Sequence, residues 1–334
     1  MAIARLCRGG VKMPYVGSGA SLQVGKETTW GTAVSGAKII NFTNESLKVN
    51  ADKKTEDTLI ASTAPAGKDL MKLDVTGDFS GILRPEFAGY LLKLAFGGTD
   101  TKTDNSPVTG AYTHSIPLVG ASGTLPSFTA IIDRKVAVKK YSGCKVDSFS
   151  LEGAAGDYVK FTASIKAKDE STGTLASLAA LALQSFKTVN ATLTLGGTTY
   201  DAKSVKFSLK NNLQDVGQTY GSGLYNLEPI HGQREATVDI DLNYGSDTET
   251  LFDTNYVTDT QIASIVWTLK SPSVVTGSTN YTVTITMNNV AITSVERNVN
   301  GAGVLTATVS GQALSIGSTE PVVATVIDAT STVY

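Results

Sequence analysis

The sequence predicts a mainly β protein. Only 17% of the residues are charged, whereas Gly, Ser, Thr and Val are plentiful, and this composition favours half-buried strands over solvated helices. Several segments alternate apolar and polar residues, which is the pattern of a strand with one buried face. The length of 334 residues allows one large domain or two ordinary ones.

The clearest strands are predicted at 72–79 and 237–244, where every second residue is polar over most of the run. Two further runs, at 145–151 and 159–165, flank a turn rich in Gly and Ala at 153–157. We expect these two runs to pair as a hairpin.

One helix is predicted at Pro85–Phe96, packed on a sheet. Pro is tolerated in the first turn of a helix, apolar side chains fall on one face, and Gly97 follows the last turn. The run from Leu175 to Phe186 is either a second helix or a buried strand, and its lack of β-branched residues favours the helix.

The strand pattern recurs along the chain. A shift of 165 residues places 73–79 on 238–244, and a shift of 146 places the hairpin at 146–162 on 292–308. Alternating strands can align by chance, but two hairpins in the same order favour a duplication. The second copy is shorter by 19 residues, and its counterpart to the helix, at 248–256, is weak.

The duplication predicts four parts of the chain. They are an N-terminal arm at 1–16, a first module at 17–171, a second module at 173–326 and a C-terminal tail at 327–334.

Each predicted module also contains a long loop without apolar periodicity at the same place. The loops run from about Lys53 to Lys68 and from about Gln218 to Gln233. Loops of this length in compact domains are usually functional or disordered. Because the length occurs in both copies, we expect a function.

No residue pattern supports catalysis, a metal or another cofactor. The segment 19–27 ends in Gly-Lys, but its glycines are one residue too far apart for a phosphate-binding loop, and Glu27 replaces the required hydroxyl. His114 and His231 have no ligand at metal-binding spacing, and no G-x-S-x-G motif occurs.

Charge and cysteine content exclude further classes. The chain has 28 Lys and Arg against 30 Asp and Glu, so no overall field attracts nucleic acid. Cys7 and Cys144 are too few and too far apart to define a disulfide framework, and two reduced thiols are the simpler interpretation. No apolar run has the length of a signal peptide or a membrane span, so we expect no membrane anchor.

Several short motifs follow one another in an informative order. A G-x-E-[ST]-[ST]-x-G-[TS]-A motif at 25–33 precedes an extended phrase at 42–48, a long loop, a Gly77 to Pro85 motif and the phrase Tyr141–Val146. The first motif consists of Gly25, Glu27, Thr28, Thr29, Gly31, Thr32 and Ala33. This order resembles the tail tube (major tail) proteins of long-tailed bacteriophages, best over 17–169.

The resemblance implies a structural virion protein with no enzymatic activity and no cofactor. Such proteins form β-sandwiches flanked by a helix, and strands of neighbouring subunits join into a barrel around a channel. Rings then stack into a tube for DNA ejection. The implied partners are further copies of the chain, the tape measure, tail tip and terminator proteins, and DNA that passes without specific binding. The implied location is the virion tail, after assembly in the cytoplasm of a bacterial host.

The resemblance also assigns roles to residues. The barrel strands would contain Leu73, Val75, Phe79, Val146, Val159, Val238, Ile240, Ile292 and Leu305. Contacts between stacked rings would involve Thr58, Leu59, Ile60, Pro65, Gly67, Tyr220, Leu224, Tyr225 and Pro229. Because family rings have six modules and this chain has two, we expect a trimeric, pseudo-hexameric ring. A hexamer with an outer second half is the alternative.

Two expectations remain open to the structure. A surface adhesin or carbohydrate-binding β-sandwich is the rival function, and it would gather exposed aromatic residues, for which Tyr220, Tyr225 and Tyr256 are candidates, or contain an acidic calcium loop. A hydrolase is a weaker third possibility. Trp30 is expected to be a core residue under the N-terminal segment.

Overall fold

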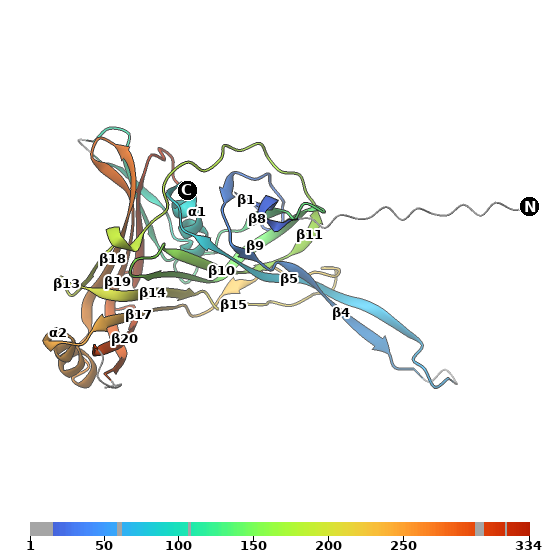
Figure 1. The fold of residues 1–334 in the computed structure, drawn as a ribbon. Helices are drawn as coiled ribbons and strands as arrows, with labels where there is room; N and C mark the ends of the chain where they lie inside the picture. Colours follow the sequence, from blue (N-terminus) through green and yellow to red (C-terminus); the bar gives the residue numbers. More distant parts are fainter. Residues whose placement is uncertain (1–15, 59–61, 106–107, 298–303, 318) are drawn as a thin grey trace, which may run out of the picture.

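The computed structural model describes residues 16–334 except 59–61, 106–107, 298–303 and 318. Antiparallel strands form most of the regular structure, with a few short helices (Figure 1). The predicted mainly β class is therefore confirmed. The expected N-terminal arm at 1–16 lies outside the described residues except for Val16.

One antiparallel sheet, which we call the long sheet, runs through both halves of the chain (Figure 1). Its strand order is β4–β5–β10–β9–β14–β17–β20–β19, and the short β3 lies ahead of β4 along β5. Its strands are β3 (Asn44–Glu45), β4 (Lys48–Glu56), β5 (Gly67–Ile82), β9 (Val138–Ala154), β10 (Lys160–Ala167), β14 (Ala202–Lys210), β17 (Glu235–Asn243), β19 (Thr279–Glu296) and β20 (Thr306–Ala313).

The other strands extend the long strands β9 and β19 away from the long sheet. The first part of β9 continues into β8, β1 and β2 on one side and β11 on the other. The first part of β19 continues into β18, β12 and β13 on one side and β21, β7 and β6 on the other. These strands are β1 (Ser21–Lys26), β2 (Lys38–Ile40), β6 (Thr101–Asp104), β7 (Tyr112–Pro117), β8 (Phe128–Asp133), β11 (Asp169–Thr172), β12 (Thr192–Leu195), β13 (Thr198–Tyr200), β18 (Ile262–Thr276) and β21 (Val322–Asp328). A separate pair is formed by β15 (Leu213–Gln214) and β16 (Ile230–His231).

The predicted helix and hairpin are both present. Helix α1 spans Pro85–Phe96 and ends at Gly97, which adopts the left-handed conformation with φ 77°. Phe87 packs edge-on against Phe161 of β10 with 5.7 Å between ring centroids, so the helix covers the core face of the long sheet. The hairpin of β9 and β10 pairs Phe149 with Ala163.

Other helical segments are short. The weak counterpart at 248–256 is helical, as α2 (Ser246–Thr250) followed by η3 (Leu251–Val257). The remaining turns are η1 (Gly17–Gly19) and η2 (Thr188–Asn190).

The segment Leu175–Phe186 is neither a helix nor a strand, so the helix prediction is wrong there. Side chains of the first half form hydrogen bonds with its backbone. The Gln23 amide exchanges hydrogen bonds with Ala176 at 2.8 and 2.9 Å, and the Glu86 carboxylate accepts from the amides of Ala182 and Leu183. These long-range contacts replace the helical hydrogen bonds that the composition favours.

Strand pairing repeats between the two halves. Ser148 pairs with Ser164 and Ser294 pairs with Ser310, and in both hairpins the register slips immediately afterwards. The offset of 146 is therefore kept in the pairing register. The second half has no counterpart of β6 and β7 between η3 and β18, where all residues are described, which explains its shorter length.

The offset of 165 for the other strand is wrong by four residues. Ser164 lies opposite Asp78 of β5, and Ser310 lies opposite Asp239 of β17, so the equivalent strands are related by a shift of 161. A slip of an even number of residues leaves every side chain on its original face. The alternating pattern could not distinguish the two registers.

Candidate functional site: an assembly surface

The long sheet has one apolar face and one polar face. On the apolar face, Val75, Phe79, Val146, Val238, Ile240 and Ile292 are buried, and Leu73 is half-buried. All of them lie on strands of the long sheet. Val159 and Leu305 each stand one residue before a strand, and Val159 is buried whereas Leu305 is 37% exposed.

The polar face carries charges of both signs. Asp239 and Asp241 share this face, as expected for residues two apart on a strand. The Asp241 carboxylate accepts hydrogen bonds from Ser204 and Thr308, and Lys210 lies 3.2 Å from Glu235. Its other charged residues include Asp78, Glu152, Lys160, Lys166 and Lys206. Because the two signs are mixed, the face has no basic stripe that would hold a polyanion.

The two halves of the chain meet in the middle of the long sheet, where β9 pairs with β14. Leu151 lies opposite Phe207, and Ser150 lies opposite Ser208. Asn211, which is fully buried, closes this junction by donating to the carbonyls of Ala95 and Val146 at 3.0 and 2.9 Å. The junction is thus an ordinary, fully paired antiparallel ladder.

Among the described residues, both ends of the long sheet leave backbone groups without a partner strand. At one end, β4 pairs with β5 and with no other described strand. At the other end, residues 294–296 of β19 pair with β20 and with no other described strand. Open edges of this kind readily pair with another chain. The described residues of the long sheet do not close into a barrel.

The first predicted loop lies at the tip of a projecting hairpin, whose strands include its end residues 53–56 and 67–68, whereas 57–58 and 62–66 form no helix or strand. β4 extends to Glu56 and β5 begins at Gly67, and the two strands form an arm that leaves the body of the molecule (Figure 1). Thr58 and Pro65 at its tip are exposed and Gly67 is half-buried, whereas Leu59 and Ile60 lie outside the described residues. The alternation in this arm is hidden because both of its faces are polar.

The second predicted loop packs against the first half of the same chain. The Leu73 amide of β5 donates to the Leu224 carbonyl at 2.8 Å, and Tyr225 continues this contact. The Nζ of Lys145, a fully buried side chain, donates to the Pro229 carbonyl at 3.0 Å. Tyr220 at the loop tip is fully exposed.

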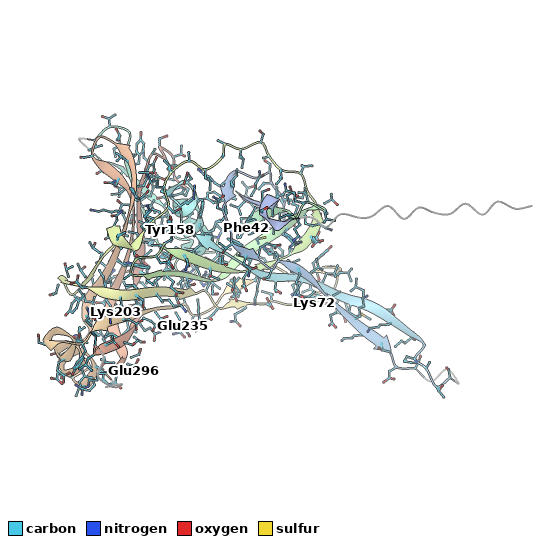
Figure 2. All side chains as sticks on the ribbon, viewed as in Figure 1. Phe42, Lys72, Tyr158, Lys203, Glu235 and Glu296 are labelled. Carbon is cyan, nitrogen blue, oxygen red and sulfur yellow. The ribbon has the colours of Figure 1, made fainter. Side chains whose placement is uncertain are left out.

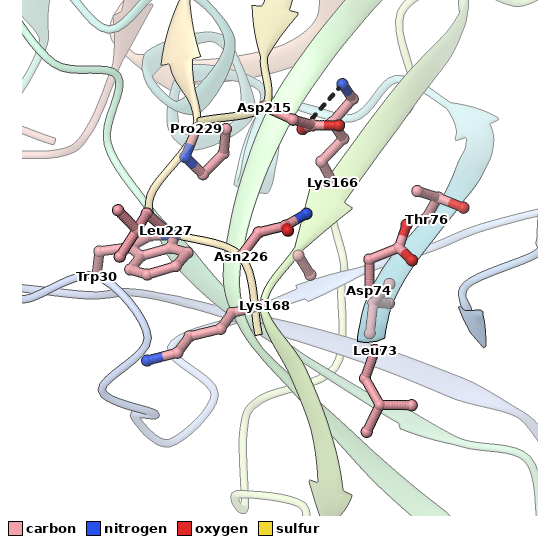
Figure 3. A pocket seen from close by; sticks show the side chains of 12 residues that line it. Trp30, Leu73, Asp74, Thr76, Lys166, Lys168, Asp215, Asn226, Leu227 and Pro229 are labelled. Atoms are coloured by element: carbon pink, nitrogen blue, oxygen red, sulfur yellow. Dashed lines mark hydrogen bonds and ion pairs between the residues drawn. The ribbon is translucent and has the colours of Figure 1, made fainter. Parts of the chain in front are cut away.

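A shallow pocket lies between this loop and β5. Figure 3 shows Trp30 and Leu227 on one side of it and Asp74 on the other. Lys166 crosses it to Asp215, which directly follows β15, at 3.3 Å. The pocket is therefore a seam between two parts of the chain. The ion pair of the buried Lys145 with the partly exposed Glu228, at 2.7 Å, was not predicted, because nothing local in the sequence marks a lysine as buried.

The N-terminal motif at 25–33 has a structural role, because its side chains form hydrogen bonds with β8 and β9. The Glu27 carboxylate is buried and accepts hydrogen bonds from the Gly31 amide, the Thr129 hydroxyl and the Gly143 amide at 2.8–2.9 Å. Trp30 donates to the Gly143 carbonyl at 3.0 Å, and its ring, which is only half-buried, lies under Lys168. The expectation that Trp30 is a core residue is therefore wrong.

The candidate ligands do not form a chemical centre. His114 is buried between Asp100, at 2.9 Å, and the Thr330 carbonyl, and it anchors the last residues of the chain. His231 bonds to backbone carbonyls. In the described part of the chain, no three metal-binding side chains gather at one place.

Two further predictions concern cysteines and membranes. Cys144 is a free, buried thiol whose pKa is raised by burial, and Cys7 lies outside the described residues. None of the helices among the described residues has the length and apolar character needed to span a bilayer.

The tyrosines proposed for an adhesin are not on one element. Tyr220 and Tyr225 belong to the second loop, whereas Tyr256 lies on η3 and packs against Phe252 with 5.5 Å between ring centroids. They do not form the aromatic platform that the adhesin alternative requires.

Comparison with known proteins identifies one family. The family described as phage tail tube protein matches residues 17–313, which is most of the chain. No curated protein matches the sequence significantly.

Proposed function

The chain belongs to the family of phage tail tube proteins, and we propose that its copies join through the open edges of the long sheet into rings that stack into the tail tube. The observation that carries this proposal is the β9–β14 ladder, in which two similar halves already join edge to edge. A further copy can extend the sheet in the same way until it closes and leaves no edge.

We propose that the apolar face packs on the covering strands and that the polar face lines the channel. Leu73, Val75 and Phe79 of β5, with their counterparts listed above, would then form the outer wall of the barrel. A lumen with charges of both signs would let DNA pass, because each neutralised phosphate would add salt-dependent affinity and slow its passage. DNA ejection through this lumen is the proposed role, without catalysis and without a cofactor.

The proposed ring contains three chains. The modules at 17–171 and 173–326 contribute matching strands in matching order, β4–β5–β10–β9 and β14–β17–β20–β19. Six modules of the family ring therefore correspond to three chains. A hexamer with a decorative second half would require the second-half strands to lie outside the barrel, although they are continuous with the first.

Stacking is assigned to the arm and the second loop. Thr58, Pro65 and Gly67 of the arm and Tyr220 of the loop are available at the surface. Leu224, Tyr225 and Pro229 instead support the loop from within the chain, so their proposed role in stacking is indirect. Leu59 and Ile60, which lie outside the described residues, belong to the same proposal.

Family membership makes the chain a structural protein of the virion tail. We propose the tape measure, tail tip and terminator proteins as its partners and the host cytoplasm as its place of assembly.

Electron microscopy of the purified protein tests the proposed function. Hollow tubes built from rings are the expected result, and native mass spectrometry of a single ring should give three chains. Protein that stays monomeric at high concentration, and with added tail tip complex, would contradict the proposal. Six chains around one channel would contradict the trimer alone.

A further inference from the structure

The junction inside the chain provides a template for the junction between chains. At the β9–β14 ladder, Phe149 lies opposite Leu209, and Ser150 lies opposite Ser208. In the order of the long sheet, β9 is the edge strand of the first module, and β14 is the edge strand of the second module that faces it. In a closed ring the corresponding partners are β19 of one copy and β4 of the next.

The pairing registers define which residues correspond. Ser294 of β19 is the counterpart of Ser148 of β9, because they pair with Ser310 and Ser164, respectively. The counterpart of Ser208 on β14 is Lys48 on β4. These two residues pair with Thr237 and Thr76, which occupy equivalent places on β17 and β5.

We infer that the end of β19 in one copy pairs antiparallel with β4 of the next copy in one defined register. This inference rests on the proposed function. Val295 lies opposite Val49, Glu296 opposite Lys48, and Ser294 opposite Asn50. The partner is a second copy of this chain, and the contact follows from equivalence to the β9–β14 ladder.

The side chains in this register are complementary. Lys48 and Glu296 are both exposed, and among the described residues neither has an ion-pair partner. Val49 is 37% exposed, and Val295 is half-buried against the core. The register therefore places opposite charges together on the polar face and two valines together on the apolar face.

The backbone of β4 is ready for this pairing. The Ser46 amide donates to the Asp78 carbonyl of β5 at 2.9 Å. Because backbone groups alternate in direction along a strand, Lys48 also faces β5, and Val49 directs its amide and carbonyl to the open edge. Arg134 holds the start of this edge through Glu45 and the Leu47 carbonyl.

The two edges cannot meet within one chain. They are separated by the whole width of the long sheet, and Figure 2 shows Glu296 at the end of the molecule opposite to the arm that carries Lys72. A link between positions 48 and 296 would therefore join different chains.

Cross-linking of mixed single variants tests the register. Lys48→Cys chains and Glu296→Cys chains are assembled together under reducing conditions, examined by electron microscopy and then oxidised. Directly opposite residues whose backbones are not hydrogen-bonded to each other are close enough for a disulfide, so covalent dimers are expected only in the mixture. A chain with both substitutions should give a ladder that ends at the trimer. Val295→Cys and Ser294→Cys, each mixed with Lys48→Cys, are the register controls.

The outcomes separate this inference from the proposed function. Normal tubes that do not cross-link, or that link more strongly through a control position, would overturn the register and leave the tube intact. Unsubstituted protein that never forms tubes would overturn both. If the cysteine variants do not assemble, charge reversal decides. Lys48→Glu and Glu296→Lys should each slow assembly and together restore it, and a lack of restoration would overturn the pairing.

Discussion

The Ser310 hydroxyl on β20 donates a hydrogen bond to the Asp239 carboxylate on β17, with 2.7 Å between the oxygens. Ser164 donates to Asp78 at the equivalent place in the first half. Both pairs lie on the polar face. Each half of the chain therefore has a carboxylate at the equivalent position, and each carboxylate accepts a hydrogen bond from a serine. Six such carboxylates would line each proposed ring.

These carboxylates are expected to keep the channel from binding DNA. Asp239→Lys places a cation at three of these six positions, and assembled tubes should then retain DNA at low salt and release it at high salt. Asp239→Asn, which keeps an acceptor for Ser310, is the matched control. Filter binding of DNA to tubes at several salt concentrations is the measurement. Equal DNA retention by both variants would argue against a lumenal position.

Glu27 should be important for folding. Glu27→Ala removes the acceptor of three hydrogen bonds, two of them from backbone amides. Because each buried donor left unsatisfied costs about 1–3 kcal/mol, we expect a loss of about 3 kcal/mol in the free energy of unfolding, measured by urea denaturation of the unassembled subunit. Glu27→Gln keeps one acceptor oxygen and should lose less. Equal stability of all three proteins would contradict this role.

Trp30 should contribute less than a core aromatic residue. Its ring is half-buried and its indole donates one hydrogen bond to Gly143. Trp30→Ala should therefore cost about 1–2 kcal/mol, below the roughly 3–5 kcal/mol typical of a fully buried ring. Thermal unfolding of the subunit measures the change, with Trp30→Phe as the control that keeps an aromatic ring but lacks the indole donor. Unchanged stability with lost assembly would instead indicate a subunit contact.

The tip of the arm, at 57–66, should be dispensable for folding and required for stacking. Glu56 lies directly opposite Gly67, so residues 57–66 can be replaced by Asn-Gly, which favours a two-residue hairpin turn. We expect an unchanged melting temperature and rings that do not form long tubes in electron micrographs. Full-length tubes from this variant would show that the tip of the arm does not stack the rings.

Alkaline pH should unfold the subunit through its buried tyrosines. Burial raises the pKa of Tyr90 to about 12, and it raises that of Tyr141 to about 12 although the neighbouring Arg134 acts to lower it. A phenol whose folded pKa is raised stabilises the fold fully below its unfolded pKa of about 10 and loses this contribution as pH rises towards 12.

Unfolding should therefore coincide with tyrosinate absorbance between these pH values. Tyr141→Phe removes one such group and should make the transition less steep. Ionisation of these two phenols in a subunit that is still folded near pH 10 would contradict their burial.

Local patterns were enough for the sequence to determine several elements. Pro85 and Gly97 mark the two ends of α1, because one fits the first turn and the other adopts a positive φ. The turn at 153–157 between two alternating runs predicted the β9–β10 hairpin. The offset of 146 is found again in the structure, because a hairpin is a local unit and its own residues determine its register.

Tertiary structure alone decided the rest, since those features depend on residues far apart in sequence. The sequence offset between the equivalent strands β5 and β17 was ambiguous by four residues, because an even shift leaves an alternating pattern unchanged. The segment Leu175–Phe186 is not helical, because its backbone forms hydrogen bonds with the side chains of Gln23 and Glu86. The burial of Glu27 and Lys145 and the β9–β14 ladder have no local signal, because each requires two distant segments to be brought together first.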